Sequence, residues 1–169
     1  MTPITLTPVG VIRSEHQCAE ATPAQPVFAR ECTGRVELLP EYAEGLTDID
    51  GFSHIILLYW LHKATPGALL VKPLLDDALH GVFATRYPGR PNAIGLSVVR
   101  LVRHEGSVLH ILGVDILDGT PLLDIKPYSS VFDSVTDVRN GWLAGVDAET
   151  AQRRGRREYR APIEQVTAP

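Results

Sequence analysis

Residues 95–119 read GLSVVRLVRHEGSVLHILGVDILDG, and this stretch decides the fold class. Two runs rich in Val, Leu and Ile flank a polar turn at Glu105-Gly106. Apolar β-type runs on either side of a glycine-containing turn are typical of a β-hairpin. The stretch therefore predicts two antiparallel strands, and Asp118-Gly119 has the residue types of a further turn.

Similar short apolar runs, separated by Gly, Pro and Asp, occur along most of the chain. We expect further strands within residues 4–14, 34–40, 53–62, 67–73, 80–86 and 120–128. The run at 53–62, SHIILLYWLH, lacks polar alternation, so we expect it to be buried on both faces. Closely spaced strands with little helix between them predict an all-β (mainly β) fold, either a barrel or a sandwich.

Helical signals are few. Pro40 can open a helical turn within 40–51, and Gly45 can close it. Asp147 can cap a C-terminal helical tail within 147–160. Strands do not alternate with crossover helices, and neither G-x-G-x-x-G nor a P-loop is present. The sequence thus argues against the common nucleotide-binding α/β folds.

The composition is that of an ordinary soluble domain, with 169 residues, 44% hydrophobic and 21% charged. No apolar run is long enough to span a membrane, and we find no secretory signal. Cys18 and Cys32 make neither a disulfide framework nor a zinc-ligand set, so we expect a reduced, cytoplasmic protein without a metal site. The net charge of −4 disfavours a protein that coats nucleic acid, while the basic run at 152–160 is either a local binding surface or a solvated helix face.

A stiff, arginine-bearing loop follows one of the predicted strands, in HGVFATRYPGRPNAIGLS, residues 80–97. Its prolines limit the backbone, so Arg86 and Arg90 have little freedom to lose when they bind a carboxylate or a phosphate. Asn92 adds a donor and an acceptor. The alternative, a tight turn whose arginines pair with surface acids, has equal support from spacing.

Polar groups also gather in GVDILDGTPLLDIKPY, residues 113–128. Asp124, Lys126 and Tyr128 have the same parity along one predicted strand, so their side chains face one side of the sheet. Asp115 lies on the neighbouring predicted strand. Because the alternate residues of the last strand are apolar, this polar row is either a solvent face or a functional site.

The histidines at 54, 62 and 80 show no metal-ligand spacing, and we expect each to be a core residue or to line a pocket. No G-x-S-x-G motif is present, and neither cysteine lies in a catalytic signature. Covalent catalysis therefore has no support in the sequence.

Five segments in this order resemble the TrmO (YaeB-like) family: PVGVIRS, TPAQP, GFSHIILLYWLH, GVFATRYPGRPNAIGLS and GVDILDGTPLLDIKPY. The resemblance covers roughly residues 4–142, and it implies a small β-barrel that binds S-adenosyl-L-methionine near a homodimer interface. It also implies a methyltransferase that modifies N6 of threonylcarbamoyladenosine in tRNA, next to the anticodon. On this basis residues 1–142 form the β-barrel methyltransferase domain, and residues 143–169 form a C-terminal tail within the same domain or in a dimer contact.

The resemblance also implies which residues form the site. The cofactor pocket would involve Pro26, Val27, Phe28, His62, Lys63, Arg86, Leu96, Val114 and Asp115. Arg90 and Asn92 join this set because they lie in the same stiff loop as Arg86. The catalytic candidates, which would orient or deprotonate the acceptor nitrogen, are Asp115, Asp124, Lys126 and Tyr128. We expect Asp115 and Tyr128 to act closest to the reacting atoms.

Three features depart from the family pattern, and one of them is Tyr87, which stands where a small residue is common. Ala93 stands where a proline is usual, and the chain ends soon after GWLAG, whereas longer members have a further C-terminal domain. We therefore expect tRNA binding to depend on the arginines of the tail, Arg153, Arg154, Arg156 and Arg157. Two alternatives share the cofactor pocket: an enzyme with a small-molecule acceptor, and a non-catalytic regulator that binds S-adenosyl-L-methionine.

Overall fold

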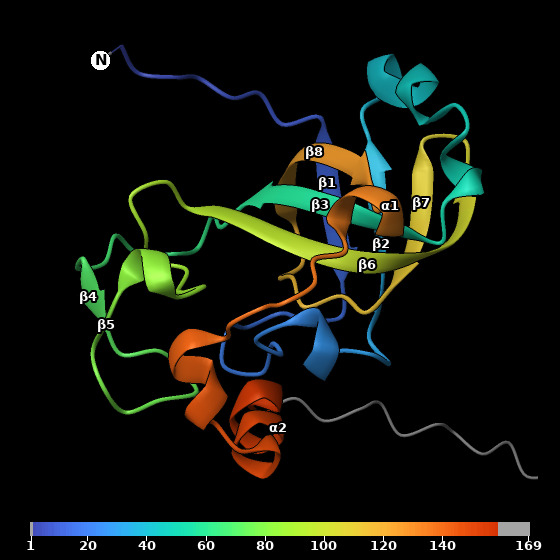
Figure 1. Ribbon diagram of the computed structural model, residues 1–169. Coiled ribbons are helices and arrows are strands. Elements are labelled where there is room, and N and C mark those ends of the chain that lie inside the picture. Colours follow the sequence, from blue (N-terminus) through green and yellow to red (C-terminus); the bar gives the residue numbers. More distant parts are fainter. Residues whose placement is uncertain (1, 159–169) are drawn as a thin grey trace, which may run out of the picture.

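The computed structural model describes residues 2–158, and its centre is a closed barrel with strand order β1-β2-β7-β6-β3-β8 (Figure 1). The barrel strands are β1 (Gly10–Ser14), β2 (Thr33–Leu38), β3 (His54–Trp60), β6 (Ile94–Glu105), β7 (Val108–Leu112) and β8 (Thr120–Pro127). All neighbouring strands in the barrel are antiparallel. The prediction of an all-β barrel is confirmed.

The hairpin predicted at 95–119 is formed by β6 and β7. Glu105 pairs with Val108, and Gly106 takes a φ of +62°, a backbone conformation that favours glycine in a tight turn. The first half of β6 pairs with β3 and its second half pairs with β7. A register shift between Leu101 and Arg103 lies where β6 curves from one partner to the other. This one long strand therefore helps to close the barrel.

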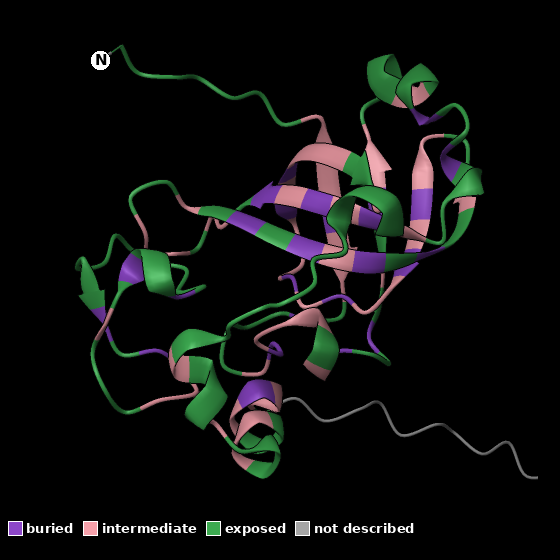
Figure 2. Cartoon of the chain, viewed as in Figure 1, coloured by how far each residue is buried: buried purple, intermediate pink, exposed green. Residues whose placement is uncertain are grey.

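Alternation along the strands separates the barrel interior from its outer surface (Figure 2). In β3, Ile55, Leu57 and Tyr59 are buried, while the residues between them are only partly covered and Trp60 is 50% exposed. The prediction that 53–62 is buried on both faces is therefore wrong. A strand in a closed barrel of this size has one inner face, and nothing within residues 2–158 packs fully over the outer face of β3.

Three other predicted strands are shorter than the sequence suggested. Strand β1 begins only at Gly10, and the run at 67–73 contributes the two-residue strand β4 (Leu70–Val71). The run at 80–86 forms β5 (His80–Gly81) and then the 3-10 turn η4 (Val82–Ala84). Strands β4 and β5 pair with each other outside the barrel, so no long neighbouring strand extends them.

Short helices fill the connections. They are the 3-10 turns η1 (Pro26–Phe28), η2 (Pro40–Leu46), η3 (Ile49–Gly51) and η5 (Gly141–Gly145), together with α1 (Ser130–Asp133) and α2 (Ala148–Arg156). The helical turn predicted at 40–51 is thus two 3-10 turns. Among the described residues, no helix has the length and apolar character needed to cross a membrane.

The C-terminal tail packs onto the loops below the barrel. Asp147 caps α2 as predicted, because its side chain accepts a hydrogen bond from the Thr150 amide at 2.8 Å. Gly155 of α2 lies against the ring of Phe28, and its carbonyl accepts from the Ala24 amide at 2.8 Å. The proposed boundary at residue 142 stays a prediction, and residues 159–169 of the tail, with the end of the basic run, lie outside the described residues.

The contact between α2 and Phe28 generates a stability prediction. A Cβ at position 155 would lie 2.3 Å from the Phe28 ring, so Gly155→Ala must displace the ring or the helix. We expect a loss of about 1–3 kcal/mol, which exceeds the roughly 1 kcal/mol that alanine gains over glycine in a helix. Thermal unfolding measures the change. Gly145→Ala is the matched control, since a Cβ there meets no atom within 4 Å, and a Gly155→Ala melting temperature at or above wild type would contradict the packing argument.

Candidate functional site

Three side chains form a continuous hydrogen-bonded chain at one end of the barrel. The Tyr59 hydroxyl and the Ser97 Oγ are 2.9 Å apart, and Ser97 Oγ donates to Oδ1 of Asp115 at 2.6 Å. Tyr59 and Ser97 point inward from β3 and β6, whereas Asp115 lies in the connection between β7 and β8. We call this end of the barrel the mouth, and it is defined by Tyr59, Ser97 and Asp115.

Burial changes the acid–base properties of this chain. It raises the pKa of Asp115 to about 7, although the Ser97 hydrogen bond, a backbone hydrogen bond and the positive charge of Arg86 all act to lower it. Burial also raises the pKa of Tyr59, which remains a neutral phenol. A carboxyl group with a pKa near 7 can exchange a proton at neutral pH, so Asp115 has the properties of a general base.

Arg86 connects the mouth to the segment around η1. Its Nη1 donates to Oε1 of Gln25 at 2.5 Å, and Gln25 immediately precedes Pro26–Phe28. The Arg86 charge also lowers the pKa of both Asp115 and Tyr59. The structure therefore brings together two segments that the sequence analysis had assigned to one cofactor pocket.

Arg90 has a different environment in the same loop. Its Nη1 donates to the carbonyl of Thr85 at 3.1 Å, and its guanidinium carbon lies 6.0 Å from the centre of the Phe83 ring. Asn92 is exposed, and its backbone carbonyl accepts from the Ile94 amide at 2.7 Å. Neither arginine pairs with a surface acid in these contacts: Arg86 binds the Gln25 amide oxygen beside the mouth, and Arg90 binds a carbonyl of its own loop.

His62 and Lys63 follow β3 at the same end of the barrel. His62 is half-buried, with Nδ1 at 3.4 Å from the Thr120 hydroxyl and its ring 6.4 Å from that of Trp60. Burial, and then the Lys63 charge, lower the pKa of His62, which favours the neutral ring. Val114 is fully buried in the core. Its neighbour Asp115 instead directs its carboxylate toward Ser97 at the mouth.

The remaining predicted residues lie on the outer surface of the barrel. Asp124 and Lys126 form an ion pair at 2.8 Å, which confirms that they share a face of β8. Leu58 pairs with both Leu96 and Asp124, so Leu96 lies on this outer face too. Tyr128 follows β8, where its amide donates to the His54 carbonyl at 3.1 Å. Within one chain, Asp115 therefore lies at the mouth, whereas Leu96, Asp124 and Lys126 lie on the outer face and Tyr128 follows the end of β8.

Sequence reasoning missed Tyr59, Ser97 and Gln25. The signal for Ser97 was present in IGLSVVRL, because alternation places residue 97 on the same face as Val99 and Leu101. A polar residue in an inward row needs a hydrogen-bond partner. Neither Tyr59, in an apolar run, nor Gln25, in a proline-containing loop, had a comparable signal.

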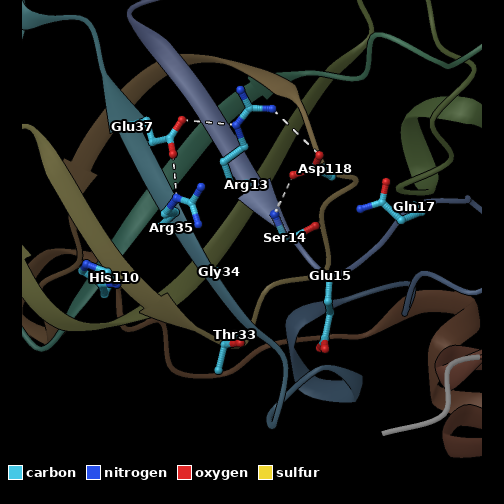
Figure 3. Close-up of a pocket in the computed structure, with 10 residues that line it drawn as sticks. All are labelled: Arg13, Ser14, Glu15, Gln17, Thr33, Gly34, Arg35, Glu37, His110 and Asp118. Carbon is cyan, nitrogen blue, oxygen red and sulfur yellow. Dashed lines mark hydrogen bonds and ion pairs between the residues drawn. The ribbon is translucent and has the colours of Figure 1, made fainter. Parts of the chain in front are cut away.

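A hollow lies elsewhere, on the outer surface of β1 and β2 (Figure 3). Its volume is about 600 Å³, and none of the predicted site residues lines it. Arg13 and Arg35 bind the Glu37 carboxylate at 3.2 and 2.6 Å, and the Arg35 hydrogen bond is the main reason that the pKa of Glu37 is lowered. Its arginines form ion pairs with Glu37 and Asp118, so these charged groups are less available to a ligand than the polar groups of the mouth.

One cluster among residues 2–158 has metal-ligand chemistry. Candidate ligand atoms of Glu15, His16 and Cys32 lie within 4.8 Å of one another. His16 Nε2 is also 2.8 Å from the Val114 carbonyl, which fixes the orientation of the ring beside the mouth. Metal-ligand spacing does not identify this trio in the sequence, because Cys32 is distant from Glu15 and His16 along the chain.

Comparison with known proteins agrees with this geometry. The family model "tRNA-methyltransferase O N-terminal domain" matches residues 11–134. Over 136 residues the chain is 54% identical to a probable S-adenosyl-L-methionine-binding protein of Pyrococcus abyssi, covering 80% of this chain and 74% of that one. It is 39% identical over 140 residues to the tRNA (adenine(37)-N6)-methyltransferase of Homo sapiens, covering 78% of this chain and 31% of the relative.

Solved structures show the same relationship. The crystal structure of TrmO from Pseudomonas aeruginosa superposes with a TM-score of 0.71 at 42% identity, covering 83% of this chain and 63% of that one. The chain therefore spans less than two thirds of that solved protein. Because the family model covers most of the barrel and the mouth, the chain belongs to the tRNA-methyltransferase O N-terminal domain family.

Proposed function

We propose that this protein is an S-adenosyl-L-methionine-dependent methyltransferase that acts on tRNA in the cytoplasm. Its substrate is N6 of threonylcarbamoyladenosine next to the anticodon. Family membership and the names of the relatives support the cofactor and the reaction class. The observation that carries the proposal is Asp115, a carboxyl group with a pKa of about 7 beside Arg86 at the barrel mouth.

The residues around the mouth fit the chemistry of the cofactor. Arg86 can bind the methionine carboxylate, and Asp115 is an acceptor for the cofactor ammonium or for a substrate proton. Exposed Val27 and half-buried Phe28, together with the ring of His62, offer apolar contact for an adenine and a thioether. When bound, the cofactor supplies an electrophilic methyl group on its sulfonium.

Methyl transfer to N6 requires the nitrogen to lose its proton. The Asp115 carboxylate would accept the N6 proton as the nitrogen takes the methyl group that the bound cofactor would supply, and the cofactor would leave as a neutral thioether. The reaction then balances without a further reactant. Asp124, Lys126 and Tyr128 remain proposed catalytic residues, and they can contribute only if they reach the mouth of another copy.

We also propose that the functional form is a homodimer. Leu96 and Ser97 are consecutive in β6 and point to opposite faces, so Leu96 cannot face the mouth of its own barrel. On the outer face, exposed Trp60 pairs with Ile94, and Leu58 pairs with Leu96, which is 46% exposed. A second copy that covers this apolar face would place Leu96, Asp124 and Lys126 in a shared interface.

Fewer of the tail arginines are available for tRNA binding than the sequence suggests, because some have partners within the chain. Arg154 binds Asp77 at 3.1 Å, and Arg157 donates to the Ala19 carbonyl. A tRNA phosphate would have to replace these intrachain partners. Arg153, which is exposed on α2, is the member of the group whose position best suits such a contact.

A second candidate function is binding of S-adenosyl-L-methionine without tRNA methylation. The name of the Pyrococcus abyssi relative favours it, since that protein is described only as a probable binding protein. An enzyme with a small-molecule acceptor is a further variant of the same pocket. Cofactor binding alone does not separate these possibilities, because all of them require it.

Methylation of defined tRNAs tests the proposed function. We expect the full chain to transfer a labelled methyl group to tRNA that contains threonylcarbamoyladenosine and not to the same tRNA without it. Nucleoside analysis locates the methyl group. Cofactor binding by calorimetry with no transfer to either tRNA would instead support the binding-protein alternative.

The role of Asp115 gives a pH prediction. We expect the wild-type kcat/KM to rise with pH through about 7 and then level, because the ionised carboxylate is the active form. Asp115→Asn should lower kcat by on the order of 10²–10⁴-fold and remove this rise. Asp50→Asn, on the exposed turn η3, is the matched control.

The same shift predicts how Asp115 affects stability. Its pKa is about 7 in the folded state against an ordinary value of 3.8, so the folded state loses stability as pH rises from about 4 to about 7 and then levels. At pH 8, Asp115→Asn should therefore melt at or above the wild-type temperature. A low activity accompanied by a lower melting temperature would point to a structural defect rather than to the loss of a base.

The homodimer is tested by charge on the outer face. Leu96→Glu should raise the dimer dissociation constant by about 30-fold or more, because it buries a carboxylate in an apolar contact. Analytical ultracentrifugation over a concentration series measures this constant. Val102→Glu, at an exposed position farther along the same strand, is the control, and equal behaviour of the two variants would reject this interface.

A further inference from the structure

We propose that Tyr59 and Ser97 are positioning residues that orient the Asp115 carboxylate and stabilise its ionised form through a chain of hydrogen bonds, and that Gly95 is required for this arrangement. The inference rests on the proposed function, in which Asp115 accepts a proton. The juxtaposition of the four residues at the barrel mouth carries it: Gly95 and Ser97 in β6, Tyr59 in β3 and Asp115 in the connection before β8.

The hydrogen bonds have one direction when Asp115 is ionised. A carboxylate only accepts, and a serine hydroxyl has one proton, which Ser97 gives to Asp115. The Tyr59 hydroxyl, 2.9 Å from Ser97 Oγ, must then donate to Ser97. Hydrogen bonds in such a chain polarise one another, so Tyr59 strengthens the bond that Ser97 makes to the carboxylate.

The two hydroxyl groups of this hydrogen-bonded chain are shielded from water. Ser97 is 1% exposed and Tyr59 is 5% exposed, so water does not readily replace either hydroxyl. Without the Ser97 donor, the carboxylate would be buried with fewer partners and its negative form would be less stable. The hydrogen bonds from the two hydroxyls thus counteract the rise in the Asp115 pKa that burial causes. They also limit the directions in which the carboxylate can point.

Gly95 explains how a tyrosine fits in this position. Gly95 and Tyr59 are directly opposite each other in the β3–β6 pairing. A Cβ on residue 95 would lie 2.1 Å from Cε2 and 2.4 Å from Cζ of the Tyr59 ring. Only glycine lets the ring lie against the β6 backbone and bring its hydroxyl to Ser97. Gly95 and Ser97, the glycine and serine of the I-G-x-S segment, therefore help to position the Asp115 carboxylate in addition to forming part of β6.

The test compares pH profiles of the whole 169-residue chain and its variants. Ser97→Ala removes the donor, so we expect the acid limb of kcat/KM to move up by about one pH unit, with most activity regained at higher pH. Tyr59→Phe should move the limb in the same direction by less. Ser97→Thr retains the hydroxyl and should restore the wild-type profile, while Ser107→Ala, in the β6–β7 turn, is the matched control.

Gly95→Ala tests the same chain without removing a hydroxyl. The added methyl displaces the Tyr59 ring, so its profile should shift in the direction of Tyr59→Phe. Thermal unfolding confirms that each variant is folded. If Gly95→Ala does not fold, Tyr59→Phe and Ser97→Ala decide the question alone.

A second measurement separates this inference from the proposed function. NMR titration of the Asp115 carboxyl carbon reports its pKa in ligand-free protein, without any assay of activity. An upward shift in Ser97→Ala supports the hydroxyl chain even if the wild type methylates no tRNA, in which case only the proposed function fails. An unchanged Asp115 pKa and an unchanged acid limb in both hydroxyl variants would overturn the inference while leaving the methyltransferase proposal intact.

Discussion

The structure depends on closure of the six-stranded sheet, which gives every barrel strand one inner and one outer face. Ile55, Leu57 and Val99 fill the interior because alternation leaves them nowhere else to be buried. The same rule carries the polar pair Tyr59 and Ser97 inward at the mouth. Their hydroxyls must be satisfied there, and the Asp115 carboxylate provides the terminal acceptor.

The connections between strands supply the rest of the site. Residues 61–93 leave the barrel after β3 and return into β6, and they place Arg86 beside the segment that contains Gln25. The tail closes over this segment, where Gly155 meets Phe28. Segments far apart in sequence therefore converge at one end of the barrel, whose rigid wall fixes where each begins and ends.

Two aspartates show how environment separates similar groups. Asp115 is half-buried by surface exposure, and loss of solvation raises its pKa to about 7 even though the Ser97 hydroxyl donates a hydrogen bond that acts to lower it. Asp124 lies on the outer face and pairs with Lys126, an arrangement that is worth little to stability when exposed to solvent. The first carboxyl has the acid–base properties of a catalytic group in a single chain, whereas a contribution from the second requires a neighbouring copy.

Sequence alone predicted the all-β class, the β6–β7 hairpin and the cap of α2, because alternation, turn residues and capping are local properties. Tertiary structure decided that β3 has an exposed outer face, that Arg90 serves its own loop, and that Leu96 and Asp124 lie on a different face from Asp115. These outcomes depend on which strands become neighbours when the barrel closes. Closure is a long-range constraint, and no short window of residues contains it.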